Sequence, residues 1–291
     1  MKLILHPSVY LIARQAIDRN SLLSFFKNEN MGYTATGVNT DAELIAELAG
    51  RICYMSFDKP RPGGNVAYLD HIKECKHGST LEHSHFCFII TGISRSLSHE
   101  LVRHRAGWGF SQLSQRYVDE SVAEYVVPEE YRVAVKVAQN YNLHNYSTSI
   151  MTQIVQDPDL IGYSFEDLQQ LHKIGTVWIK NIYDAHDGYK RLIALTSERL
   201  KNKGYTGTDL KKHIRQAARS VLPNATETKM FLSANARALR HFIEMRGHTS
   251  ADKEMQKLAN AVLEVCKKEA PNIFNDYFED KEGINTPYRK V

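Results

Sequence analysis

The stretch SHFCFIITGISRSLSHELVRHR, residues 84–105, changes character halfway along. Its first half is rich in Phe and Ile and is short enough to form a buried strand rather than a membrane span. From Ser94 onward the pattern becomes helical, and the stretch ends in Arg103-His104-Arg105. The sequence therefore predicts a core strand followed by a helix that leads to a basic tripeptide.

Two helices are predicted on the N-terminal side of this stretch. Thr40 and Glu43 have the spacing of a capping box at the start of a helix over residues 41–55. The segment DKPRPGGN then breaks the pattern, and Asn65 can cap a second helix over residues 66–77.

Helical patterns also dominate the C-terminal half of the chain. Ser164 opens a long pattern that stops at Gly204, whereas residues 121–160 are mixed and favour no single element. Three more helices are predicted at about residues 208–221, 227–246 and 250–268, ended by Pro223, Gly247 and Pro271. We expect a helix-rich α+β fold with a small sheet, and a single domain over residues 1–291 without an internal linker.

The composition is that of an ordinary soluble protein. The chain has 291 residues, of which 43% are hydrophobic and 24% charged, which suffices for a sizeable core. A net charge of +4 suits anionic small ligands as readily as nucleic acid. The four cysteines form no Cys-x-x-Cys pair, which indicates a reducing compartment. We expect a cytoplasmic protein without an export signal or a membrane partner.

The segment RHRAGWGFSQLSQRY, residues 103–117, carries many hydrogen-bond donors and no acidic residue. Guanidinium groups match phosphate and carbonyl oxygens in pairs, so Arg103, Arg105 and Arg116 favour an anionic, planar ligand. The alternative is a solvated basic face whose arginines pair with the flanking acids Glu100, Asp119 and Glu120. Spacing alone leaves both interpretations open.

Two glycines of this segment have two explanations of their own. Gly107 and Gly109 would let the backbone approach a phosphate, and a plain turn explains them equally well.

A second group of donors lies in the late helical segments. Arg215 and Arg219 are one helical turn apart, and residues 227–246 carry Asn235, Arg237, His241 and Arg246 among core-type residues. Two basic clusters that are distant in sequence can line one cleft. The alternative is that Arg237 and Arg246 are ordinary exposed helix residues, with Arg246 favourably placed near a helix C-terminus.

The histidines and aromatic residues allow two other functions. A metal-dependent nucleotide hydrolase would use His77, His83 and His85 with His99 or His104 as ligands. An RNA-binding protein would use the basic tripeptide for phosphates and Trp108, Phe110 and Tyr117 for stacking.

A covalent mechanism is not favoured by the candidate nucleophiles. No cysteine follows a proline, and Cys87 lies in the apolar strand, where a structural thiol is expected. Ser114 lies near arginines, which stay protonated and are poor bases, so ligand contact is its expected role.

The basic segment also carries a resemblance to a known family. RHRAGWGFSQLSQRY resembles the signature of the flavin-dependent thymidylate synthases, the ThyX family, which is Arg-His-Arg, about seven residues and then Ser. RICYMSF, CKHGSTLEHSHFCFIITGISRSLSHELVRHR and RQAARSVLPNATETKMFLSANARALRHFIEMR resemble family segments in the same order. The resemblance covers roughly residues 40–130 and 213–275.

Two features depart from the family pattern. Eight residues, Ala106 to Leu113, separate Arg105 from Ser114. Residues 135–212 also look longer than in many members, and we interpret them as an added helical insert outside the site.

The resemblance implies a ThyX-like fold and a methyltransferase that converts dUMP to dTMP. It implies bound FAD, 5,10-methylenetetrahydrofolate as the carbon donor and NADPH as the reductant of the flavin. It also implies a homotetramer whose sites are shared between subunits, with no nucleic acid partner. Because the cofactor does the redox chemistry, the protein needs donors that orient three ligands rather than a catalytic dyad.

The resemblance assigns a role to each matching residue. It implies that FAD is bound by His77, Ser79, Glu82, Arg103, His104, Arg105, Gln112, Asn235, Arg237 and His241. His241 stands at a position where some members have Asn. For dUMP it implies Glu100, Arg103, Gln112, Leu113, Ser114, Gln115, Arg116, Arg219 and Arg246, with Glu100 at a position that is Gln in some relatives. Arg246 is the expected catalytic residue, because the matching arginine contacts uracil and a fixed cation stabilises negative charge on the pyrimidine. No metal ligand is implied.

Overall fold

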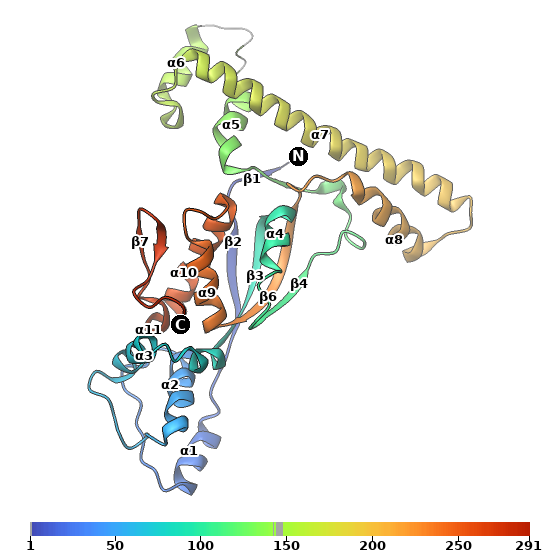
Figure 1. Cartoon of the computed structure of the whole chain (residues 1–291). Helices are drawn as coiled ribbons and strands as arrows, with labels where there is room; N and C mark the ends of the chain where they lie inside the picture. The colour runs from blue at the N-terminus through green and yellow to red at the C-terminus, as the bar shows by residue number, and fades with distance from the viewer. Residues whose placement is uncertain (1, 142, 144–147) are drawn as a thin grey trace. The chain divides into compact units, whose positions relative to one another are not determined.

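The computed structural model describes residues 2–141, 143 and 148–291 (Figure 1). The chain divides into two units, each described here by itself. Unit 1 comprises residues 1–6, 92–98 and 113–228, and unit 2 comprises residues 7–91, 99–112 and 229–291. The single domain over 1–291 and the insert over 135–212 both stay predictions, and residues 142 and 144–147 of that insert lie outside the described residues.

Most of a four-stranded sheet, with the order β2-β3-β6-β4, belongs to unit 2. β2 (Ser8–Arg14) pairs antiparallel with β3 (His85–Ser94), and β4 (Trp108–Gln112) pairs antiparallel with β6 (Glu227–Asn235). The strand predicted in residues 84–94 is therefore confirmed as β3. Its alternate residues Phe86, Phe88 and Ile90 are almost fully buried, as the period of a strand requires.

The helix predicted over residues 227–246 is wrong in its first half, where β6 lies. Met230, Leu232 and Ala234 are buried and alternate with the more exposed Lys229 and Phe231. This period of two places one apolar face of the strand against the core. The helix α9 (Ala236–Arg246) begins only after Asn235, whose side-chain oxygen accepts from the backbone N–H of Ala238 at 2.8 Å.

The remaining elements of unit 2 are mostly helical. They are α1 (Arg19–Asn28), α2 (Asp41–Tyr54), α3 (Gly64–Glu74), the 3-10 helix η1 (Gly78–His83), α10 (Lys253–Glu269), α11 (Pro271–Phe274) and the hairpin of β7 (Phe278–Asp280) and β8 (Gly283–Asn285). The helix predicted over 250–268 is confirmed as α10. α4 (Arg95–Leu101) is shorter than the sequence indicates, so the tripeptide 103–105 lies beyond its end.

Two predicted caps are wrong because buried polar partners compete for the side chains. Thr40 precedes α2, yet its hydroxyl makes no capping hydrogen bond; Glu43 instead accepts from the backbone N–H of Asn39 and of Asn272, each at 2.7 Å. α3 begins after Gly63, and Asn65 lies inside it, where its amide donates to the Glu47 carboxylate at 2.8 Å.

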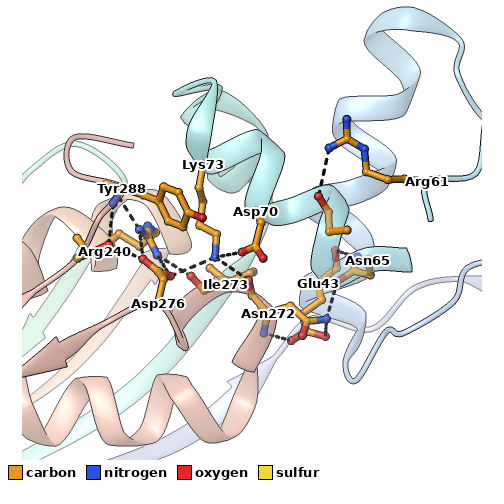
Figure 2. A network of polar contacts seen from close by, with 12 residues as sticks. Glu43, Arg61, Asn65, Asp70, Lys73, Arg240, Asn272, Ile273, Asp276 and Tyr288 are labelled. Atoms are coloured by element: carbon orange, nitrogen blue, oxygen red, sulfur yellow. Dashed lines mark hydrogen bonds and ion pairs between the residues drawn. The ribbon is translucent and has the colours of Figure 1, made fainter. Parts of the chain in front are cut away.

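A buried polar network joins the helices of unit 2 (Figure 2). Arg240 of α9, which is 1% exposed, binds both oxygens of Asp276 at 2.8 Å. Lys73 of α3, which is 2% exposed, donates to Asp276 and to the backbone carbonyl of Asn272, each at 3.2 Å. Lys73 also pairs with Asp70 of its own helix at 2.9 Å. Asp276 is the carboxylate that both cations share, and it ties α9 to α3.

Unit 1 contains the long helix α7 (Phe165–Lys201), which packs against α5 and α8. Its capping box at Ser164 and its stop before Gly204, where φ is 85°, confirm the prediction from sequence. The other elements are a parallel pair of β1 (Leu3–Ile4) and β5 (Tyr125–Val126), the helices α5 (Arg132–Asn140), α6 (Thr148–Gln156) and α8 (Gly207–Ala218), and the 3-10 helices η2 (Glu120–Val122), η3 (Glu129–Tyr131), η4 (Pro158–Leu160) and η5 (Arg219–Val221). α8 and η5 together account for the helix predicted over 208–221. In the described part of the chain, no helix combines the length and apolar character of a membrane span.

Candidate functional site

Arg246, the last residue of α9, lies between a histidine and a carboxylate of unit 2. Its Nε donates to Nε2 of His104 at 3.1 Å, and its Nη1 donates to Oε2 of Glu100 at 3.2 Å. The two partners come from the end of α4 and the turn after it, far from Arg246 in sequence. Two directed hydrogen bonds therefore fix the orientation of this guanidinium.

His104 is held as a neutral hydrogen-bond acceptor. Its ring meets that of Phe242 edge-on at 5.4 Å. Burial lowers the pKa of His104 to about 4, and the charges of Arg246 and His241 add to this effect. Because Nε2 accepts from Arg246, the proton of the neutral ring belongs on Nδ1.

A cavity of about 250 Å³ opens beside this group in unit 2. It is lined by Glu82, Ala106, Gly107, Asn235, Arg237, Ala238 and His241. Gly107 has a φ of 76°, and an added Cβ would lie 2.6 Å from Nδ2 of Asn235 and 2.9 Å from the Cβ of Ala238. Gly107 is therefore required both by its backbone conformation and by the close approach of α9, and an approach of this backbone to a phosphate stays a prediction.

The 3-10 helix η1 and the residue before it carry His77, Ser79 and Glu82, which are predicted to bind the flavin. Glu82 accepts from Nη1 of Arg237 at 2.5 Å, which ties η1 to α9. An added Cβ at Gly78 would lie 2.8 Å from Nε of Arg237, so the backbone between His77 and Ser79 also runs against this arginine. The structure thus brings Glu82 of η1 and Arg237 of α9 together.

The arginines of the basic segment do not pair as the solvated-face alternative requires. Glu100 binds Arg246, and Asp119 binds Arg215 at 3.3 Å. Among the described residues, no hydrogen bond or ion pair engages the guanidinium groups of Arg103 and Arg105. Cations without an internal partner are suited to an anionic ligand.

The predicted dUMP residues fall in both units. Gln112 ends β4 in unit 2, where Glu100, Arg103 and Arg246 also lie. Unit 1 contains Leu113, Ser114, Gln115, Arg116 and Arg219. The carbonyl of Ser114 accepts from the backbone N–H of Tyr117 and of Val118 at 3.0 Å, so these residues form a turn. Nε of Arg116 and Nε2 of Gln115 are buried without a hydrogen-bond partner among the described residues.

Comparison with known proteins identifies the family. The family model described as thymidylate synthase complementing protein matches residues 36–272. A flavin-dependent thymidylate synthase of Corynebacterium efficiens is 38% identical over 81% of this chain and 80% of its own length. The corresponding enzyme of Mycolicibacterium gilvum is 37% identical over 82% of each. The chain belongs to the flavin-dependent thymidylate synthase family.

Solved structures share the fold of this family member. A UMP/dUMP methylase, PolB of Streptomyces cacaoi, solved with 5-Br dUMP, has a TM-score of 0.56 and 20% identity, covering 94% of this chain and 96% of its own. ThyX of Helicobacter pylori, solved with FAD and dUMP, has a TM-score of 0.51 and 21% identity, covering 93% and 98%. The predicted helix-rich α+β, ThyX-like fold is confirmed.

Family membership decides against the metal-dependent hydrolase and the RNA-binding protein as the function of the chain. The histidines predicted as metal ligands have different surroundings in the structure. His104 accepts a hydrogen bond from Arg246, whereas His83 and His85 are exposed to solvent. Among the described residues, no three His, Cys, Asp or Glu side chains gather as a metal site would require.

Some residues that line the cavity could not be predicted from the sequence. Ala106 and Ala238 line it, but small apolar residues carry no chemical signal in a sequence. The hydrogen bond between Glu82 and Arg237 could not be predicted either, because the two residues are far apart along the chain. The resemblance indicated both residues without indicating that they touch.

Proposed function

We propose that this protein converts dUMP to dTMP with FAD as cofactor, 5,10-methylenetetrahydrofolate as carbon donor and NADPH as reductant. Its family name and the FAD and dUMP in the Helicobacter pylori relative support the proposal. When bound, reduced FAD supplies the hydride that completes the methyl group. The residues of the chain bind and orient the reactants.

The cavity beside Gly107, of about 250 Å³, suits one part of a flavin dinucleotide. Gly107 and the small residues Ala106 and Ala238 leave room for a planar ring or a backbone-bound phosphate. Unpaired cations at Arg103 and Arg105 suit the pyrophosphate. We assign FAD binding to His77, Ser79, Glu82, Arg103, His104, Arg105, Gln112, Asn235, Arg237 and His241.

The turn at Ser114 suits a nucleotide monophosphate. Arg116 has a buried Nε without a partner, and Gln115 has a buried amide nitrogen in the same state. Such donors cost folding free energy unless a ligand binds them. We assign dUMP binding to Glu100, Arg103, Gln112, Leu113, Ser114, Gln115, Arg116, Arg219 and Arg246.

Arg246 is the residue that we assign to the chemistry. The single observation that carries this is its fixed position between the neutral His104 and the carboxylate of Glu100. A cation that is already oriented stabilises negative charge developing on a pyrimidine without reorganising. Because His104 is neutral, it orients Arg246 without competing as a second cation.

The assembly and compartment belong to the same proposal. We propose a homotetramer with sites shared between subunits, in the cytoplasm, with neither nucleic acid nor membrane as a partner. The thiols of Cys53, Cys75, Cys87 and Cys266 are all free, which agrees with a reducing compartment.

A binding experiment tests whether FAD and dUMP bind at one site. The protein is reconstituted with FAD, desalted and titrated with dUMP while the flavin absorption bands are recorded. Bands that remain after desalting and shift with dUMP support one site for both ligands. A folded protein that retains no FAD from an excess contradicts the proposal.

A further inference from the structure

Residues 286–291 of unit 2 lie beyond the part of the chain that the family model matches, and they are anchored to α9. Glu244 of α9, which is 7% exposed, accepts from Nε of Arg289 at 3.1 Å and from the backbone N–H of Lys290 at 2.9 Å. Lys290 has a φ of 63°, a left-handed conformation that a residue with a side chain keeps only where its surroundings fix it. Glu244 therefore holds this segment in one conformation.

The start of the segment is fixed by the polar network of Figure 2. The hydroxyl of Thr286 donates to Asp276 and accepts from the backbone N–H of Tyr288 at 3.0 Å. Nη2 of Arg240 donates to the carbonyl of Tyr288 at 3.4 Å. These contacts determine the direction in which the segment continues after Tyr288.

The segment continues to Gly78, the first residue of η1. An added Cβ at Gly78 would lie 2.6 Å from the backbone carbon C of Val291 and 2.8 Å from Nε of Arg237. Gly78 is buried, and Val291 is 5% exposed. The backbone of Val291 and the guanidinium of Arg237 therefore meet on the same side of Gly78.

Arg237 joins this contact to the candidate flavin site. Its Nη1 donates to Glu82, and both side chains line the cavity of about 250 Å³. The two side chains are 43% and 48% exposed, so the ion pair alone fixes Arg237 only weakly. An arginine side chain has many rotamers, and a neighbour that fills the space on one side removes some of them. Val291 is such a neighbour.

We infer that residues 289–291 position Arg237 for FAD, with Glu244 as their anchor. This inference rests on the proposed function, which assigns Arg237 to FAD binding. Arg237 touches the cofactor, whereas Glu244 and Val291 act through Arg237 and are positioning residues. Loss of the anchor releases Val291, gives Arg237 more rotamers and raises the entropic cost of binding FAD.

The test measures FAD binding to the full chain by flavin fluorescence, in a double-mutant cycle of Glu244→Gln and Arg237→Gln. We expect Glu244→Gln to weaken FAD binding roughly 3- to 30-fold in the wild-type background and to have no further effect in the Arg237→Gln background. A purely structural role would weaken binding in both backgrounds. Glu244→Asp, which keeps the carboxylate, should retain more affinity than Glu244→Gln. Asp280→Asn is the control, because Asp280 binds Asn285 within the β7–β8 hairpin.

Arg289→Gln is a second variant for the case that Glu244→Gln does not fold. The side chain of Arg289 is 53% exposed, so its replacement removes one contact of the anchor and buries no new group. It should weaken FAD binding in the wild-type background only. Wild-type FAD affinity in both Glu244→Gln and Arg289→Gln, or a loss that persists in the Arg237→Gln background, overturns the inference while the proposed function stands. A folded wild type that binds no FAD overturns the proposed function and this inference with it.

Discussion

Arg246 donates to the neutral ring of His104 and to the carboxylate of Glu100, and burial is the main reason that His104 is neutral. The pKa of His104, lowered to about 4 by burial, by Arg246 and by His241, lies well below its ordinary value of 6.5. Between pH 4 and pH 6.5, the imidazole of His104 binds a proton in the unfolded chain but not in the folded chain. The free energy of unfolding contributed by His104 therefore rises as the pH rises from about 4 to 6.5 and is lost as the pH falls.

We predict that His104→Gln flattens this pH dependence. The free energy of unfolding, measured with urea between pH 4 and 7, should rise less steeply with pH in the variant than in the wild type. His83→Gln is the control, because His83 is exposed on η1. A variant that keeps the wild-type slope would show that His104 is not a neutral, buried acceptor.

The candidate residues were predictable from sequence to the extent that chemistry alone marks them. Arg246, Arg237 and the tripeptide at 103–105 stand out as donors, and the family resemblance gives them roles. Their partners could not be predicted, because Glu100 has several arginines within reach in sequence and only the fold selects Arg246.

The junction between β6 and α9 shows where element prediction fails. Residues 227–235 contain enough apolar residues to fit a helix or a strand, and the choice depends on the neighbouring strands of the sheet. Segments with strong local signals, such as β3 and the capped start of α7, were predicted correctly. In the other segments, the choice between helix and strand depends on burial against residues that are distant in sequence.

At the level of elements, the turn before β4 must approach α9 closely. We predict that Gly107→Ala lowers the free energy of unfolding by more than about 1 kcal/mol and weakens FAD binding, because the Cβ would meet Asn235 and Ala238. Gly204→Ala is a matched control: its φ is 85°, but an added Cβ would have no neighbour within 4 Å.

Urea denaturation and flavin fluorescence measure the two effects. Gly204→Ala should lose only the conformational contribution, about 1 kcal/mol, and should bind FAD normally. Equal FAD affinity in Gly107→Ala and Gly204→Ala would exclude the cavity beside Gly107 as the flavin site.

The network in Figure 2 joins helices of unit 2 through residues to which no ligand-binding role is assigned. Burial alone raises the pKa of Asp276, but Arg240 and Lys73 outweigh it and hold that pKa at about 2. The ordinary value is 3.8, so the carboxylate contributes stability above that pH and loses it as the pH falls towards 2.

At the scale of the molecule, we predict that Asp276→Asn lowers the free energy of unfolding by about 3 to 5 kcal/mol at pH 7, because two buried cations lose their shared carboxylate. Asp184→Asn, which breaks an exposed pair with Lys180 on α7, should cost at most about 0.5 kcal/mol. Urea denaturation measures both. Similar losses in the two variants would contradict the structural role of the network.

Turnover tests the central claim most directly. The FAD-loaded protein is mixed with dUMP, 5,10-methylenetetrahydrofolate and NADPH, and the dTMP formed by the wild type and by Arg246→Ala is quantified. Arg191→Ala is the control, because Arg191 is an exposed cation of α7 that pairs with Asp187. We predict dTMP from the wild type and the control, and none from Arg246→Ala although it still binds FAD. Full turnover by Arg246→Ala, or no dTMP from a wild-type protein that retains FAD, would contradict the account.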